Sequence, residues 1–439
     1  MKSSQSSGVS MKVAVAGYGV EGEENYKYWS KLGADVTIFD EAQETARPLP
    51  QGADTVLGEG VFKKLNGFDL VVRTASLNPD KIKTDGKIWS ATNEFFEECP
   101  APIIGVTGTK GKGTTCSLVA EILRASGKTV QLVGNIGVPA LEVLPKIKSS
   151  DFVVFELSSF QLWDIEKSPE TAVILMIEPD HLNIHADMDD YVMAKSNIGR
   201  FQTEDNLMIY HPTNPLSKKA AQSSQAKKVR YMTDEGAHID KNSKINIDGN
   251  IICDISEVGL LGPHNLENIC AAVSAAWRYT QDINAIKNAV TNFRGLPHRL
   301  EFVRELDGVK YYDDSYSPNP ASTRAAVSSF NQPTVLIAGG FDRKADFSEL
   351  AQVIAKKEVK KVVLIGQTAE TIATALNNAG YNNYEIIKSK DFKAIIQKAQ
   401  SYTSEGDLVL LSPGCPSFDM FKNFEERGKQ YQKIVGELK

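Results

Sequence analysis

A glycine-rich segment between an apolar strand and an apolar helix constrains this chain more than any other feature. It reads Gly108-Thr-Lys-Gly-Lys-Gly-Thr-Thr115, after the apolar residues 103–107 and before the helical pattern of 116–123. Glycines let backbone N–H groups converge on phosphate oxygens, and a helix N-terminus adds positive potential. Lys112 is placed to reach the outer phosphates. The segment therefore predicts a phosphate-binding loop in a parallel α/β domain, and a flexible turn with solvated lysines is the weaker alternative.

One position departs from the general phosphate-loop motif. Gly113 stands where the motif has a serine or threonine whose hydroxyl binds magnesium. Thr114 or Thr115 could supply that hydroxyl, so both stay open and Thr114 is the first choice. The residues expected to contact the nucleotide phosphates are Gly108, Thr109, Lys110, Gly111, Lys112, Gly113, Thr114 and Thr115.

Polar side chains follow two further apolar strands. Glu156 ends the apolar run 152–156, and His181 comes soon after the run 172–177. The carboxyl ends of parallel strands meet at one edge of a sheet, where open α/β domains bind ligands. A carboxylate and an imidazole there predict a metal site, whereas the alternative for Glu156 is a helix-capping acid. His185 is predicted to be structural, and Lys195 by its local sequence alone resembles a helix-surface lysine.

A second glycine pattern lies near the N-terminus. Gly17, Gly19 and Gly22 follow an apolar strand that begins at Met11, and Asp40 ends the next strand. This arrangement fits the dinucleotide fingerprint, with a tight turn near a pyrophosphate and an acid near a ribose hydroxyl. Taken alone it is a weak signal, but it indicates a second diphosphate site.

Length and pattern indicate three domains in these 439 residues. The expected ranges are a disordered tail at 1–10, a Rossmann-like domain at 11–98, a central ATP-binding domain at 99–296 and a Rossmann-like domain at 297–439. All three are α/β, and the central one has a P-loop ATPase-like parallel sheet with flanking helices.

Composition excludes several classes of protein. A formal net charge of -6 disfavours nucleic acid as a partner. The five cysteines are scattered without any C-x-x-C pair, which predicts neither a zinc site nor a disulfide framework and fits a reducing compartment. No apolar run approaches the ~20 residues of a membrane helix. We therefore expect a cytoplasmic protein without membrane insertion.

Taken together, the motifs resemble those of the Mur ligases along essentially the whole chain from Met11. The motifs that carry the resemblance are G-T-K-G-K-G-T-T (108–115), G-N-I-G (134–137), F-E-L-S-S-F-Q-L (155–162), D-H-L-N (180–183), G-P-H-N-L-E-N-I-C-A-A (262–272), G-L-P-H-R (295–299) and S-P-G-C-P-S-F-D-M-F-K-N-F-E-E-R-G (412–428). Several independent motifs in one order make the signal specific. The motifs at 156–162 and 412–428 are most similar to those of members that add D-glutamate.

The resemblance implies a monomeric ligase that adds D-glutamate to UDP-N-acetylmuramoyl-L-alanine with ATP and Mg²⁺, two ions being expected. In the central domain, Lys112 would contact phosphates, Glu156 and His181 would bind magnesium with Thr114, and Lys195 would be carbamylated and bind the second ion. Lys112, His181 and Lys195 are thus the expected catalytic residues. The physical reason for Lys195 is that only a deprotonated, buried amine reacts with carbon dioxide.

The resemblance also implies how the substrates are held. Residues expected to hold ATP besides the loop are Asn268, Arg299 and Asp314. Residues expected along the UDP precursor are Gly19, Val20, Asp40, Ser76, Asn135, Ser158 and Ser159. Residues expected to hold D-glutamate are Arg343, Lys344, Ser417 and Phe424.

This chain departs from the family at four positions. Tyr316 replaces a usual lysine and Pro318 a usual threonine, in the segment that begins at Asp314. In the glutamate pocket, where a lysine is usual after two glycines, Arg343 or Lys344 is available for the distal carboxylate. Glu21 stands where a small hydroxyl residue is common in the uridine loop.

Four rival functions are considered beside this one. A folylpolyglutamate synthase shares the ATP domain and a similar loop, but about a hundred residues precede the loop here, where that enzyme has no nucleotide-sugar domain. A Mur ligase that adds another amino acid is the second. An NAD-dependent oxidoreductase or a non-catalytic protein with this fold leaves Lys112, Glu156, His181 and Lys195 unexplained.

Overall fold

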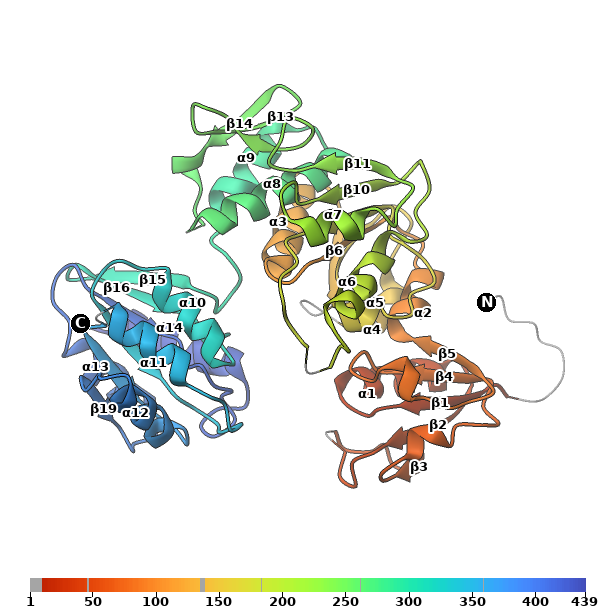
Figure 1. The fold of residues 1–439 in the computed structure, drawn as a ribbon, viewed down its shortest axis with the longest axis horizontal. Helices are drawn as coiled ribbons and strands as arrows, with labels where there is room; N and C mark the ends of the chain where they lie inside the picture. The colour runs from red at the N-terminus through yellow and green to blue at the C-terminus, as the bar shows by residue number, and fades with distance from the viewer. Residues whose placement is uncertain (1–9, 46, 135–138, 183, 261, 358) are drawn as a thin grey trace. The chain divides into compact units, whose positions relative to one another are not determined.

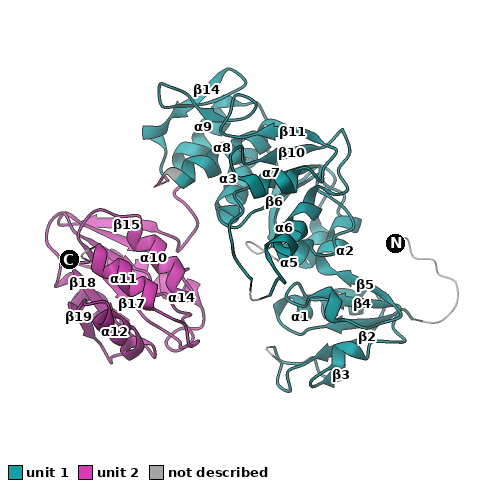
Figure 2. Ribbon diagram, in the orientation of Figure 1, with its two compact units in different colours: residues 1–259, 263–293 teal, residues 260–262, 294–439 magenta. Residues whose placement is uncertain are grey.

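The computed structural model describes residues 10–45, 47–134, 139–182, 184–260, 262–357 and 359–439. The chain separates into two compact units, residues 1–259 with 263–293 and residues 260–262 with 294–439 (Figures 1 and 2). In the described residues, the first unit contains two parallel sheets and a small antiparallel sheet, and the second unit contains one mixed sheet. The expected mixed architecture of α/β layers is confirmed. The boundaries of the three predicted domains stay a prediction.

The first sheet has the strand order β3-β2-β1-β4-β5, with all described pairs parallel. Its elements are β1 (Lys12–Ala16), α1 (Val20–Lys31), β2 (Asp35–Asp40), β3 (Asp54–Leu57), β4 (Leu70–Arg73), β5 (Lys87–Ser90) and α2 (Ala91–Glu98). Alternate residues of β1 enter two hydrophobic clusters, one on each face of the sheet. Because β1 pairs with both β2 and β4, the strand order reverses there, and the glycine turn after β1 meets the loop after β4.

The middle sheet has the order β11-β10-β9-β6-β8-β7 and is parallel in the pairs described. Its strands are β6 (Ile103–Thr107), β7 (Val130–Gly134), β8 (Phe152–Glu156), β9 (Thr171–Ile174), β10 (Leu207–Tyr210) and β11 (Lys227–Arg230). Its helices are α3 (Lys112–Ala125), α4 (Ala140–Val143), α5 (Ser159–Leu162), α6 (Met188–Ser196), α7 (Pro215–Ala221), α8 (Pro263–Trp277) and α9 (Ile283–Asn292). A small antiparallel sheet contains β12 (His238–Ile239), β13 (Lys244–Ile247) and β14 (Asn250–Asp254).

The order of the middle sheet positions the site. Since β6 lies between β9 and β8, the loop that leaves β6 is flanked by the segments that leave those two strands. The phosphate loop, Glu156 and the segment that contains His181 therefore share one edge of the sheet.

The sheet of the second unit has the order β15-β16-β20-β17-β18-β19, antiparallel between β15 and β16 and parallel elsewhere. Its strands are β15 (Glu301–Leu306), β16 (Val309–Asp313), β17 (Thr334–Ala338), β18 (Lys361–Leu364), β19 (Tyr384–Ile386) and β20 (Leu408–Leu411). Its helices are α10 (Pro320–Ser328), α11 (Ser348–Lys356), α12 (Ala369–Asn378), α13 (Phe392–Gln400) and α14 (Phe424–Glu437). Helices α10 to α12 cover one face, and α13 and α14 cover the other.

The helices of the described residues include none that is both long and apolar enough to cross a membrane.

Candidate active site

The loop between β6 and α3 has the geometry of a phosphate-binding turn. Gly108 and Gly111 have φ angles of 143° and 84°, which side-chain-bearing residues rarely adopt. A Cβ on Gly111 would lie 2.2 Å from Oδ1 of Asn268, so α8 lies directly against the loop. The sequence predicted both the loop and Asn268 for ATP, and the structure brings them together.

Two lysine amines lie on the inside of this loop. Nζ of Lys112 donates to the carbonyl oxygens of Gly108 at 3.2 Å and Thr109 at 3.1 Å. Nζ of Lys195, on α6, donates to the same Gly108 carbonyl at 2.9 Å, and Lys195 is only 1% exposed. Burial lowers the pKa of the Lys195 amine well below its usual range, and the nearby charge of Lys112 lowers it further. Lys195 is therefore an interior amine of the site rather than a surface lysine.

Threonine and tyrosine hydroxyls connect α6 to the loop. Oγ1 of Thr109 lies 3.1 Å from the hydroxyl of Tyr191 and also donates to the carbonyl oxygen of Glu178 at 3.1 Å. The ring of Tyr191 lies 4.5 Å from Nζ of Lys195. Lys110 points elsewhere, pairing with the Glu178 carboxylate at 3.2 Å on the surface. Sequence reasoning did not select Tyr191, although its position four residues before Lys195 puts both on one helix face.

Glu156 lies near the same thiol as Lys112, and His181 lies near both Lys112 and Lys195. Burial raises the pKa of the Cys116 thiol. The Glu156 carboxylate raises this pKa further and Lys112 lowers it, so Glu156 and Lys112 both lie near the thiol. Burial lowers the pKa of His181, Asp180 opposes this, and Lys195 and Lys112 lower it too. His181 has the unusual φ of 56° and is half-exposed. The site thus contains one carboxylate and one imidazole whose neutral form is favoured, which suits metal binding.

The serines after β8 form hydrogen bonds with nearby residues. Ser158 caps α5 in a reciprocal pair with Gln161. Oγ of Ser159 lies 2.9 Å from Nε2 of His185, whose Nδ1 lies 2.9 Å from Asp190 at the start of α6. His185 is 2% exposed and links α5 to α6, which agrees with its predicted structural role.

In the first sheet, the predicted precursor residues surround the glycine turn. Asp40 accepts hydrogen bonds from the backbone N–H groups of Tyr18 at 2.6 Å and Ala42 at 2.8 Å, so both of its oxygens hold the backbone in this state. Val20 is 52% exposed at the start of α1. Gly19 is half-buried and Ser76 is exposed. Asn135 lies outside the described residues.

In the second unit, Asp314 follows β16 and is 2% exposed. Burial raises the pKa of its carboxyl to about 6, and bonds from Ser317, Ser412 and the backbone of Leu300 oppose this. The guanidinium of Arg299 lies 5.9 Å from the centre of the Tyr316 ring. Tyr316, which stands at the usual lysine position, therefore provides an aromatic face and no cation.

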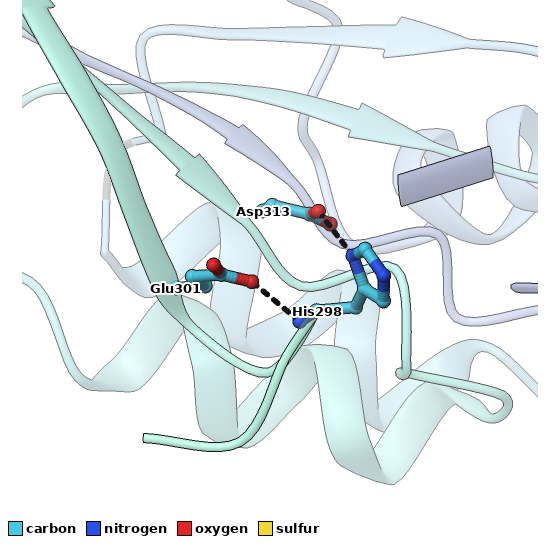
Figure 3. Close-up of side chains that lie close together, drawn as sticks. All are labelled: His298, Glu301 and Asp313. Carbon is cyan, nitrogen blue, oxygen red and sulfur yellow. Dashed lines mark hydrogen bonds and ion pairs between the residues drawn. The ribbon is translucent and has the colours of Figure 1, made fainter. Parts of the chain in front are cut away.

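A cluster beside these residues fixes the backbone that carries them (Figure 3). Nδ1 of His298 lies 2.7 Å from Oδ2 of Asp313, and the His298 backbone N–H donates to Glu301 at 2.7 Å. Gln432 on α14 donates to both carboxylates at 2.9 Å. These three groups are close enough to hold a cation, but their hydrogen bonds to one another and to Gln432 already account for them. Because His298 precedes Arg299 and Asp313 precedes Asp314, the cluster orients the two predicted ATP residues.

Of the predicted glutamate residues, Arg343, Lys344 and Ser417 lie on loops of the second unit, and Phe424 begins α14. Arg343 and Lys344 are exposed, and the Arg343 guanidinium lies 6.0 Å from the Phe418 ring centre. Ser417 is 2% exposed, and the Phe424 ring packs edge-on against Tyr316 at 4.8 Å.

Comparisons with known proteins show which family this chain belongs to. The family model described as the Mur ligase middle domain matches residues 106–276, and the one described as the Mur ligase glutamate ligase domain matches 298–415. A UDP-N-acetylmuramoylalanine–D-glutamate ligase of Clostridium botulinum is 37% identical, and one of Clostridium kluyveri is 39% identical, each over 97% of both chains. The chain belongs to the Mur ligase family.

Solved structures of other proteins share the fold of this Mur ligase. The UDP-N-acetylmuramate-alanine ligase MurC of Thermotoga maritima aligns with a TM-score of 0.60, 16% identity, and 98% of this chain with 100% of that one covered. E. coli FolC in complex with ADP aligns with a TM-score of 0.57 and 18% identity, but covers only 79% of this chain and 93% of its own. The Mur-type fold therefore accounts for more of the chain than the FolC fold does.

The donor set of this Mur ligase fits a divalent cation bound to a triphosphate. Glu156 supplies a carboxylate that is 7% exposed, and oxygen ligands of this kind suit Mg²⁺. Of the two threonine hydroxyls left open by Gly113, that of Thr115 is buried without a hydrogen-bond partner among the described residues, and Thr114 is 8% exposed. The amine of Lys112 adds positive charge that an anionic ligand would offset.

Proposed function

We propose that this chain joins D-glutamate to the carboxyl group of UDP-N-acetylmuramoyl-L-alanine, with ATP as the energy source and ADP and phosphate as products. The observation that carries the proposal is the identity of 37% to 39% over 97% of both chains with relatives named for this reaction. Mur ligases are ATP-dependent carboxylate–amine ligases. What we propose beyond this is which precursor and which amino acid this chain joins.

For ATP, the proposal assigns the triphosphate to the loop of residues 108–115 and the remaining contacts to Asn268, Arg299 and Asp314. Support comes from the contact between Asn268 and Gly111 and from the helix N-terminus that follows the loop. Asp314 has a buried carboxyl that suits a ribose hydroxyl, and the His298 cluster holds it in place.

For metal ions, the proposal assigns Glu156 and His181 to magnesium with a hydroxyl of Thr114, and a carbamylated Lys195 to a second ion. The lowered pKa of the buried Lys195 amine supports carbamylation, because only the neutral amine reacts with carbon dioxide. Magnesium, when bound, would neutralise charge on the phosphates.

The chemical problem is that a carboxylate is a poor electrophile with no leaving group. Transfer of the γ-phosphoryl group of ATP to the precursor carboxylate creates an acyl phosphate, and the amine of D-glutamate then displaces phosphate. Lys112 stabilises charge on the transferred group, as a cation that needs no reorganisation at that moment. The loop backbone orients the phosphates, and alignment of the two substrates contributes much of the remaining rate.

For the two substrates, the proposal keeps the predicted residues. Precursor contacts are assigned to Gly19, Val20, Asp40, Ser76, Asn135, Ser158 and Ser159. D-glutamate contacts are assigned to Arg343, Lys344, Ser417 and Phe424. Arg343 is supported as the partner of the distal carboxylate because it is exposed and lies over Phe418. A cytoplasmic, monomeric enzyme is part of the same proposal.

The test measures phosphate release by the purified chain with ATP, UDP-N-acetylmuramoyl-L-alanine and a panel of amino acids. Turnover that requires D-glutamate supports the proposal, whereas turnover with another amino acid, or with a folate in place of the precursor, refutes it. Lys112→Ala should abolish D-glutamate-dependent ADP formation, because it removes the cation of the loop. Lys146→Ala, which changes an exposed lysine outside the loop, serves as the control.

A further inference from the structure

A fully buried arginine joins the first sheet to the middle sheet. Arg73 ends β4, is 0% exposed, and was not among the predicted site residues. Its Nε donates to Asp164 Oδ2 at 2.7 Å, and its Nη2 donates to the other oxygen of the same carboxylate. Nη2 also donates to the carbonyl oxygen of Phe160 at 3.0 Å. A buried guanidinium is costly unless it is paired and hydrogen-bonded, and here one carboxylate and one carbonyl of the middle sheet supply that compensation.

The third nitrogen of Arg73 binds the loop that follows its own strand. Nη1 lies 3.3 Å from each of the carbonyl oxygens of Thr74, Ala75 and Leu77. The backbone N–H of Ala75 is held from the other side by Glu21 of α1, at 2.8 Å. Residues 74–77, called the substrate loop below because they contain Ser76, are thus fixed through their carbonyls by Arg73 and through an N–H by Glu21.

The substrate loop also packs against the glycine turn. A Cβ on Gly17 would lie 2.4 Å from Oγ1 of Thr74, so the two segments are in close contact. On the other side, the Phe160 that accepts from Arg73 has its ring 5.0 Å from the ring of His181. One side chain therefore connects the glycine turn of the first sheet with the site at the edge of the middle sheet.

Other contacts already hold the two sheets together. Phe95 and Phe96 of α2 lie in the hydrophobic core of the middle sheet, and Asn93 donates to the carbonyl oxygen of Asp164 at 2.9 Å. An exposed ion pair between Lys87 and Glu166, at 2.8 Å, crosses between the same segments. Loss of Arg73 should therefore free the substrate loop without separating the sheets.

We propose that Arg73 is a positioning residue for the nucleotide precursor, because its guanidinium fixes the substrate loop to the Phe160–Asp164 segment and so sets where the bound precursor presents its carboxyl group. The inference rests on the proposed function, in which the first sheet holds the UDP moiety. ATP binds at the middle sheet in that function, so its affinity is independent of Arg73.

The test compares Arg73→Met with wild type for binding of UDP-N-acetylmuramoyl-L-alanine by calorimetry and for steady-state kinetics. The expected result is a KM and Kd for the precursor raised about tenfold or more and a lowered kcat, because misplacement of a substrate by a small distance is costly. The KM for ATP should be unchanged. Arg73→Lys should recover part of the precursor affinity, because a lysine keeps the positive charge but cannot form the bidentate hydrogen bonds of a guanidinium.

Lys87→Met is the matched control, since it removes an exposed ion pair between the same segments and should leave all constants unchanged. If Arg73→Met does not fold, Asp164→Ala removes the partner carboxylate, which is 22% exposed, and should raise the precursor KM in the same direction.

A folded Arg73→Met or Asp164→Ala variant with the precursor KM of wild type overturns the inference, as does a loss of kcat that only follows the folded fraction. Wild type that neither binds nor turns over the precursor refutes the proposed function instead.

Discussion

The amine of Lys195 donates a hydrogen bond of 2.9 Å to the carbonyl oxygen of Gly108, the first residue of the phosphate loop. A lysine from α6 is thereby held at the loop although 87 residues separate the two positions. Its neighbour Lys112 binds the same carbonyl at 3.2 Å. Two amines on one carbonyl disfavour a charge on both, and burial together with the charge of Lys112 lowers the pKa of Lys195 well below its usual range.

Lys195→Ala should lower kcat at least about a hundredfold, because the variant cannot form the proposed carbamate or its anionic charge. Small carboxylates such as acetate should restore part of the activity, since they supply a carboxylate in the vacated space. In wild type, ¹³C-bicarbonate should give a carbamate NMR signal that Lys195→Ala lacks. The control is Lys219→Ala, which removes an exposed lysine paired with Asp189. Unchanged kcat in Lys195→Ala, or no carbamate signal in wild type, contradicts the prediction.

Gly111→Ala should abolish ATP binding, because its Cβ would lie 2.2 Å from Oδ1 of Asn268 and would push the loop away from α8. Gly127→Ala is a matched control, since Gly127 has a similar φ of 80° but no atom within 4 Å of an added Cβ. Both variants carry the backbone strain of a left-handed alanine, about 1 kcal/mol, so the melting temperature should fall in both, and further in Gly111→Ala because of the contact with Asn268. Nucleotide binding by calorimetry should separate them, and equal affinities would refute this account of the loop.

Asp314→Asn should alter how stability depends on pH. Burial raises the pKa of Asp314 to about 6 in the folded chain, above its ordinary value of 3.8. The folded state therefore holds the proton more tightly, and this contribution is fully present below 3.8 and is lost as pH rises through about 6. Relative to the asparagine variant, wild type should lose unfolding free energy between those two values. Denaturant titrations at several pH values measure the difference, and parallel curves would contradict it.

The same variant should raise the KM for ATP at neutral pH, since the amide replaces one acceptor oxygen of the carboxylate with an NH₂ donor. A KM equal to that of wild type would remove Asp314 from the proposed ribose contacts.

Much of the fold could be predicted because its signals are local. Hydrophobic periodicity and composition suffice to place the apolar strand 103–107, the glycines of 108–115 and the helix after them, because these segments are contiguous. Strands β3, β5 and β12 to β14 were not predicted, because polar residues leave only one to three consecutive apolar residues in each of them.

Less of the site could be predicted from the residues around each position. Lys195 could be selected only through the family resemblance, because nothing in the residues around it indicates that its amine is buried. Arg73 was not selected at all, since an arginine that ends an apolar strand gives no local sign of a carboxylate 91 residues later. Asp40 was expected to contact the precursor, yet its oxygens hold the backbone of the glycine turn.

The sequence by itself determined the phosphate loop, the parallel α/β layers and the family, because each depends on residues close together in the chain or on motifs in a fixed order. Only the tertiary structure decided which side chains meet at the loop and which charges are buried. The strand order of the middle sheet brings Glu156, His181 and Lys195 to the edge where Lys112 lies, and the resulting loss of water around Lys195 lowers the pKa of its amine. Such burial depends on segments far apart in the sequence, so no local pattern reports it.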